Sequence, residues 1–172
     1  MLRITGVICV LAGCLGAGFQ RIAHEQQRLE HLREILRIVK RIEDEMRYGK
    51  RTVPEICAVL SGCGGERYRS CFGEIYERLM QRQGGAMEDI WRESMLKCFC
   101  DVPLREDEKA LLMQIPDCLG MQDECTQASS IVQFRELVER RLRQAEDEYD
   151  GKRKMIWSVS ALAGIFLVVI LI

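Results

Sequence analysis

The sequence predicts an all-α protein: a six-helix bundle with long antiparallel first and last helices, flanked by N- and C-terminal transmembrane helices. Through the middle of the chain, apolar residues recur at steps of three and four, and no stretch shows sustained alternation of apolar and polar residues. Charge is confined to that middle, which holds 24 of the 25 Lys and Arg and all 26 Asp and Glu. The chain therefore divides into an N-terminal transmembrane helix (1–20), a helical bundle (21–154) and a C-terminal transmembrane helix (155–172).

The first expected element is a membrane helix over residues 4–19. It has seven strongly apolar residues but also four glycines, so its insertion is only weakly favoured. Arg3 would anchor its outer end. Residues one turn apart form overlapping faces of small side chains suited to close helix packing, namely Gly13 with Ala17 and Cys14 with Gly18. Two alternatives stay open: a signal peptide removed on export, and a lipoprotein lipidated on Cys14, because the preceding Leu-Ala-Gly resembles a lipobox.

The bundle begins without a break, as a long helix from Gln20 to Gly49. A capping box with Pro54 in the first turn and Glu55 at its fourth position then opens a short second helix. A third helix ends at Gly84-Gly85, and a fourth runs from Met87 to the segment before Pro103. The apolar stripes of these four helices predict a buried core that includes Leu29, Leu32, Leu36, Val39, Ile42, Met46, Tyr68, Cys71, Phe72, Ile75, Met80, Ile90, Trp91, Met95 and Phe99.

A fifth helix starts in the acidic run 106–108, which suits the positive end of the helix dipole, and Pro116 is expected to kink it. The sixth follows Gly120 and runs to Gly151. Its apolar positions are Ile131, Phe134, Val138, Leu142, Ala145 and Tyr149. Because the first and last helices are both attached to one membrane surface, we expect them to lie side by side and antiparallel.

The last element is the uncharged run 155–172, which would span roughly 27 Å as a helix, close to the ~30 Å hydrocarbon core of a bilayer. Trp157 suits the interface, and Gly164 lies on a second face of small residues. Just before the run stand three cations: Lys152, Arg153 and Lys154. Basic residues gather on the bundle side of both segments, which predicts a two-pass protein of the cell membrane with a cytoplasmic bundle and both termini outside.

Catalytic, phosphate-binding and cofactor motifs are not recognised in the sequence, so we expect neither an enzyme nor a cofactor or metal site. The net charge of −1, without interleaved basic and aromatic residues, argues against nucleic-acid binding. The nine cysteines are odd in number and form no C-x-x-C pair, which favours reduced thiols in a reducing compartment. A cysteine-based redox or metal sensor stays open as an alternative function.

One acidic run offers a candidate docking patch at the end of the first long helix. It comprises Glu43, Asp44 and Glu45, with Arg47 and Tyr48 just beyond. A basic partner could bind there, although an acidic run on an amphipathic helix is also the ordinary pattern of a solvated face.

The order of these features resembles the stage III sporulation protein AB family of endospore-forming Firmicutes over essentially the whole chain. The similarity lies in the glycine-rich first segment, the run Glu45-Met46-Arg47-Tyr48-Gly49, the basic stop before a terminal anchor, and a fold signature of Pro54, Glu55, Leu119, Gly120 and Asp123. The high cysteine content and Met121-Gln122 depart from the family pattern, which bears on surface contacts rather than on the fold.

The resemblance implies a role that the residues alone do not. The family looks like the cytoplasmic domain of the type II secretion inner-membrane platform protein, and it belongs to a channel-like complex joining mother cell and forespore. By that analogy the chain would lie in the outer forespore membrane, with its bundle in the mother cell. It would bind a cytoplasmic secretion-type ATPase and other membrane components of the sporulation channel, and a homo-oligomer stays open.

Overall fold

The computed structural model describes the backbone of residues 2–49, 51–81, 86–119 and 124–171, and the backbone alone for 2–19, 21, 124, 125 and much of 157–171. Within these ranges every regular element is helical, which confirms the all-α fold class. In chain order the elements are α1 (Leu2–Asp44), the π-helical turn η1 (Glu45–Gly49), α2 (Val53–Ser61), α3 (Glu66–Met80), α4 (Met87–Phe99), α5 (Glu106–Met113), α6 (Ile115–Leu119) and α7 (Glu124–Leu171).

The chain packs as two compact units. One consists of Met1–Leu29 with Arg143–Ile172 and is called here the paired-helix unit; the other, Glu30–Leu142, is the bundle unit. The domain limits expected at residues 20 and 154 rest on hydropathy, which packing does not measure, so those limits stay a prediction.

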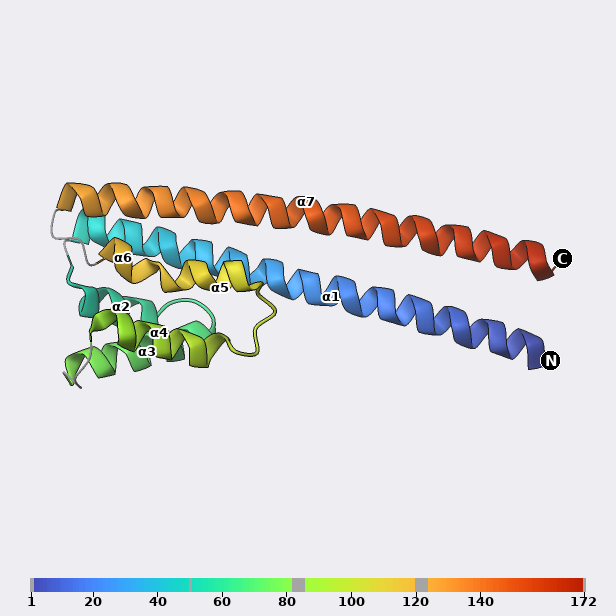
Figure 1. Ribbon diagram of the computed structural model, residues 1–172, viewed down its shortest axis with the longest axis horizontal. Helices are drawn as coiled ribbons and strands as arrows, with labels where there is room; N and C mark the ends of the chain where they lie inside the picture. The colour runs from blue at the N-terminus through green and yellow to red at the C-terminus, as the bar shows by residue number, and fades with distance from the viewer. Residues whose placement is uncertain (1, 50, 82–85, 120–123, 172) are drawn as a thin grey trace. The chain divides into compact units, whose positions relative to one another are not determined.

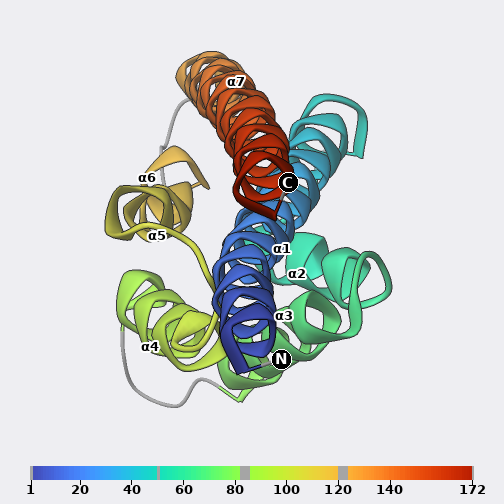
Figure 2. The ribbon, with the colours of Figure 1, turned by 90° about the vertical axis from the view of Figure 1, so that its right-hand side faces the viewer.

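In the bundle unit the short helices α2 to α6 are arranged around the C-terminal part of α1 (Figures 1 and 2). Trp91 of α4 is fully buried and meets Phe72 of α3 edge-on, with 5.7 Å between ring centroids. Burying a large apolar side chain contributes about 1.5–3 kcal/mol, so this pair stabilises the bundle unit by several kcal/mol. The buried set follows the predicted stripes and includes Leu32, Ile35, Val39, Ile42, Ile56, Leu60, Ile75, Ile90, Met95, Phe99, Ile131, Phe134 and Val138.

The expected fifth helix is interrupted rather than kinked. α5 ends at Met113, and α6 begins at Ile115, so that Pro116 lies in the first turn of a new helix, where its missing N–H is tolerated. That proline cannot donate to the carbonyl of Leu112, four residues earlier. The indole Nε1–H of Trp91 donates to this carbonyl instead, at 2.9 Å, so the break leaves no unsatisfied buried acceptor there.

Met80 also departs from the predicted core, because it is 59% exposed. It is the last residue of α3, where the helix ends and its stripe has no further turn to continue. By contrast, the apolar residues around Pro116, namely Leu111, Leu112, Ile115 and Leu119, are all buried.

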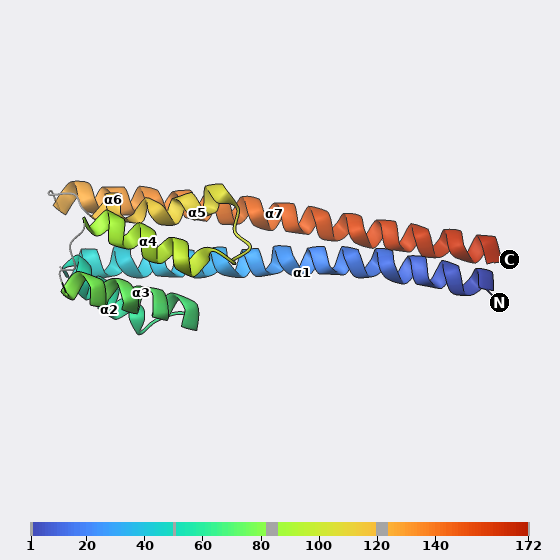
Figure 3. The same cartoon turned by 60° about the horizontal axis from the view of Figure 1, so that its bottom comes forward.

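Ion pairs join α1 to α7 in both units. In the bundle unit, Lys40 lies 3.2 Å from Glu139, and Glu43 lies 2.8 Å from Arg135. In the paired-helix unit, Glu25 pairs with Lys152, and the buried Arg28 lies 3.1 Å from Glu25 and 3.6 Å from Glu148. In each unit the residue numbers of the paired side chains increase along α1 as they decrease along α7. The predicted antiparallel arrangement is therefore confirmed within each unit (Figure 3).

Among the residues that the structure describes, no helix carries a stretch long and apolar enough to cross a membrane. Five of the expected anchoring residues have side chains outside the described set, namely Arg3, Gly13, Gly18, Trp157 and Gly164. The basic residues Lys152, Arg153 and Lys154 are described and exposed. Gly120 and Asp123 of the fold signature, and the turn at Gly84-Gly85, also lie outside the described residues.

Candidate docking surface

The π-helical turn that ends α1 is fixed by a buried carboxylate. Glu45 is 8% exposed and lies 2.8 Å from Arg41 and 3.2 Å from Arg51. A Cβ on Gly49 would come within 3.0 Å of the same carboxylate, so a glycine is the residue that this close approach allows. Because π-helical turns frequently occur at functional sites, the side chains around this turn are candidates for a functional role.

Glu43, two residues earlier, is also engaged inside the protein. Its carboxylate binds Arg135 of α7, and Arg135 lies 3.0 Å from Glu139. Hydrogen bonds from Lys40 and Arg135 lower the pKa of Glu139 and outweigh its partial desolvation. Lys40 and Glu43, near the end of α1, thus carry opposite charges that pair α1 with α7.

The five residues predicted as a docking patch therefore fall into two groups. Glu43 and Glu45 belong to internal ion pairs, whereas Asp44, Arg47 and Tyr48 are exposed, Tyr48 at 79%. The Arg47 guanidinium lies 6.0 Å from the centroid of the Tyr48 ring. That a partner docks here stays a prediction. The side chains that such a partner would meet include Arg47 and Tyr48 rather than an uninterrupted acidic run.

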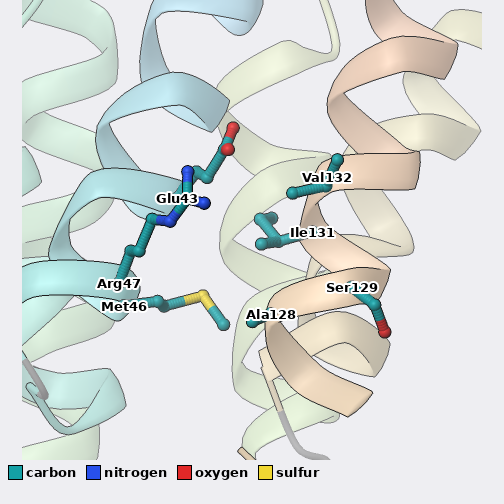
Figure 4. A pocket seen from close by; sticks show the side chains of 7 residues that line it. All are labelled: Glu43, Met46, Arg47, Ala128, Ser129, Ile131 and Val132. Atoms are coloured by element: carbon teal, nitrogen blue, oxygen red, sulfur yellow. The ribbon is translucent and has the colours of Figure 1, made fainter. Parts of the chain in front are cut away.

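A cavity of about 210 Å³ opens beside these residues, between the end of α1 and the start of α7 (Figure 4). Small-molecule sites commonly measure about 300–1,000 Å³, so this volume suits one large side chain better than a cofactor. Its walls are Glu43, Met46 and Arg47 on one side and Ala128, Ser129, Ile131 and Val132 on the other. We call this cavity with the exposed Arg47 and Tyr48 the docking surface.

The described residues of the fold signature, Pro54, Glu55 and Leu119, stabilise the fold rather than the docking surface. Glu55 accepts hydrogen bonds from the backbone N–H of Thr52 at 2.8 Å and from its hydroxyl at 2.9 Å, and Pro54 lies in the first turn of α2, which confirms the predicted capping box. These hydrogen bonds lower the pKa of Glu55. Leu119 is buried, and its carbonyl accepts from the Gln127 side chain.

A polar cluster that the sequence did not indicate joins α1 to α3. His31 is half-buried, and its Nδ1 lies 3.0 Å from the hydroxyl of Tyr68. Burial lowers the pKa of His31, and the charge of Arg67 adds to this; burial raises the pKa of Tyr68. Arg67 itself is held by Asp101 in a two-pronged ion pair and donates to the carbonyl of Cys98 at 2.8 Å. The 37 residues between His31 and Tyr68 kept this pair out of reach of any local motif.

Acidification is expected to destabilise the bundle unit through His31. The folded state holds the imidazole neutral because its pKa lies below the ordinary histidine value of 6.5, so unfolding takes up a proton as the pH falls through the unfolded pKa. Stability is therefore complete above pH 6.5 and declines from there until the pH passes below the folded pKa. Urea titrations of wild type and His31→Gln at neutral and mildly acidic pH measure this. An equal pH dependence in both proteins would contradict the assignment to His31.

Six cysteines are described, and all are free thiols. Cys57 and Cys71 are buried, and burial raises the pKa of Cys57 to about 12 and that of Cys71 further. Cys63 and Cys100 are exposed. No group of three or more metal-ligating side chains occurs among the described residues. Buried protonated thiols are poor nucleophiles, so these two do not favour a redox sensor.

The exposed and the buried thiols are expected to react with an alkylating reagent at different rates. In the native protein iodoacetamide should modify Cys63 and Cys100 readily, whereas Cys57 and Cys71 should react only after denaturation, because reaction needs an accessible thiolate. Peptide mass spectrometry after a time course resolves each site. Rapid native labelling of Cys71 would show that the interface between α3 and α4 opens, and would restore the thiol-based alternative.

The described helices define a helical-bundle protein with an exposed, partly apolar cavity at the end of α1. The chain belongs to the stage III sporulation protein AB family, because the profile described as "Stage III sporulation protein AB (spore_III_AB)" matches residues 3–172. The resemblance seen in the sequence is thereby confirmed.

Two individual proteins are similar to this chain. Stage III sporulation protein AB of Bacillus subtilis (strain 168) is 22% identical over 171 residues, covering 99% of each chain. A solved structure titled stage III sporulation protein AB matches with a TM-score of 0.64 at 18% identity, covering 72% of this chain and 97% of that one. This second match shows the fold alone. Both names are those of sporulation proteins, and neither is that of an enzyme.

Proposed function

We propose that this protein is a non-enzymatic membrane platform of the sporulation channel complex, which presents its bundle unit to a cytoplasmic secretion-type ATPase. The observation that carries the proposal is the docking surface: Arg47, Tyr48 and an apolar cavity are accessible, while Glu43 and Glu45 are already engaged in internal ion pairs. Arginine, tyrosine and methionine are enriched at protein interfaces, whereas catalysis needs a different constellation. Membership in a sporulation family makes an assembly role the natural one.

Attachment to the membrane is supported by the C-terminal part of α7. Met155, Val159, Leu162 and Phe166 follow one another at steps of four, three and four, and each is between 57% and 68% exposed. Such a row of large apolar side chains is unfavourable in water and favourable against lipid. The exposed Lys152, Arg153 and Lys154 precede it and would keep the bundle on the cytoplasmic side. Within the sporulating cell, this corresponds to the outer forespore membrane facing the mother cell.

The topology is tested by a reporter inserted at Gly84-Gly85 in the full chain. A cytoplasmic signal in the mother cell is the expected result. A matched reporter fused after Ile172 should report the opposite side, because the anchor lies between the two insertion points. An external signal at Gly84-Gly85 would exclude the ATPase partner and favour the lipoprotein alternative at Cys14.

ATPase docking is tested with the full chain in nanodiscs and the purified cognate ATPase. We expect a complex that forms without nucleotide hydrolysis and that elutes together from a sizing column. Empty nanodiscs serve as the control for lipid binding by the ATPase. If the ATPase binds empty and loaded nanodiscs equally, the platform loses its proposed partner.

A further inference from the structure

The docking surface carries a more specific conclusion about what binds it. We propose that it receives an amphipathic helix of the partner, with a large apolar side chain in the cavity and a carboxylate one helical turn away that pairs with Arg47. This deepens the proposed function and depends on it for the identity of the partner. It also reverses the expectation from the sequence, in which an acidic run would attract a basic partner.

The apolar half of this recognition follows from the cavity walls. Ile131 is 1% exposed and closes the cavity floor, while Met46 and Val132 are half-buried and flank it. In Figure 4 the Met46 thioether and the Ile131 and Val132 side chains point into the space between the two helices. A methionine adapts its shape to different guests, and a cavity of about 210 Å³ holds one large side chain.

The approach of a partner helix is eased by the residues at the mouth. Ala128 and Ser129 are exposed and small, so a backbone can come close over the first turns of α7. On the opposite side the exposed Arg47 lines the cavity, and the exposed Tyr48 follows it in the chain. A mouth with small residues on one side and a basic residue on the other suits a helix laid across it with one anchor residue pointing into the cavity.

The charged half follows from the distribution of ion pairs. Glu43, the acidic wall of the cavity, is compensated by Arg135 at 2.8 Å, and Glu45 by Arg41 and Arg51. In the described part of the chain no carboxylate pairs with Arg47, whose described contact is the Tyr48 ring. Of the two charged residues that line the cavity, Arg47 is therefore the one without an internal ion pair among the described residues, and a carboxylate is its complement, strengthened by the two-pronged geometry that arginine offers.

The test uses the full chain in nanodiscs and the purified cognate ATPase, with affinity measured by interferometry. Arg47→Glu reverses the charge at the rim, and Ala128→Trp fills the mouth of the cavity. Each single substitution should weaken binding about tenfold to a hundredfold, as expected for a hot-spot residue. Arg69→Glu, the same charge reversal at an exposed position of α3 that does not line the cavity, should change binding less than about twofold. Unchanged binding by Arg47→Glu and Ala128→Trp, with tight binding by wild type, would overturn this inference and leave the platform function standing.

A photo-crosslinker at position 132 in sporulating cells gives a readout that does not presuppose the ATPase. The crosslinked peptide should carry a large apolar residue with Asp or Glu three or four positions away, and replacing that acid by Arg should restore binding to Arg47→Glu. Failure of the ATPase to bind wild type, together with such a peptide from another protein, would reject the proposed partner and keep the recognition chemistry. Crosslinks to a second copy of this chain, to lipid, or to nothing would overturn the inference.

Discussion

Replacing Trp91 by phenylalanine is expected to lower the free energy of unfolding by about 2–4 kcal/mol. Two losses contribute. The smaller ring leaves a cavity against Phe72, and the carbonyl of Leu112 loses its donor inside the protein, because Pro116 cannot supply the helical hydrogen bond. Urea titration of the full chain in detergent, followed by circular dichroism, measures the change without relying on tryptophan fluorescence.

The second loss can be separated from the first. Pro116→Ala restores an N–H four residues after Leu112, so in the background of Trp91→Phe it should recover part of the stability, whereas in wild type it should not stabilise. Arg92→Ala, exposed on the same helix, is the matched surface control and should stay within about 0.5 kcal/mol of wild type. A Trp91→Phe protein as stable as that control would show that the indole hydrogen bond and packing contribute little.

The fold could be predicted largely because its determinants are local. Apolar spacing identified the buried faces of α3, α4 and α7, and a threonine three residues before a glutamate located the start of α2. Each signal depends on residues within one or two helical turns, where spacing fixes which side chains share a face. The break before Pro116 was harder, because whether a proline kinks a helix or begins a new one depends on what satisfies the freed carbonyl, here a tryptophan 21 residues earlier.

The docking surface could be located but not characterised from the sequence. The run at 43–48 is densely charged, yet the roles of its charges depend on partners elsewhere in the fold. Glu43 pairs with Arg135, and Glu45 pairs with Arg41 and Arg51. Of these arginines only Arg41 lies one helical turn away from its partner along the chain. Ion pairing between helices decides which charged side chain remains available to a partner. A single sequence does not reveal this pairing, because it does not give the register of one helix against another. The cavity likewise needs residues from both long helices at once.

Gly64→Ala is expected to cost about 2–4 kcal/mol, the second large effect. Gly64 has a φ of +83°, which a side chain adopts only with strain, and an added Cβ would lie 2.5 Å from Oε1 of Glu34. That oxygen accepts the backbone N–H of Gly65 at 2.9 Å, and the other carboxylate oxygen lies 2.5 Å from Arg37. The new methyl group would therefore strain the backbone and displace the buried acceptor that joins the α2–α3 turn to α1.

A double-mutant cycle distinguishes these two contributions. Glu34→Ala removes the obstacle together with the hydrogen bond, so adding Gly64→Ala to it should cost only the backbone strain of about 1–2 kcal/mol, and the double variant should lose less than the sum of the single ones. Gly62→Ala is the matched control, because Gly62 has a φ of −89° and its added Cβ would meet nothing closer than 3.4 Å. Additive losses in urea titrations would mean that Glu34 moves aside freely. Equal losses for Gly64→Ala and Gly62→Ala would mean that the left-handed conformation at Gly64 is not needed, and the turn would then be held by the packing of α2 and α3 alone.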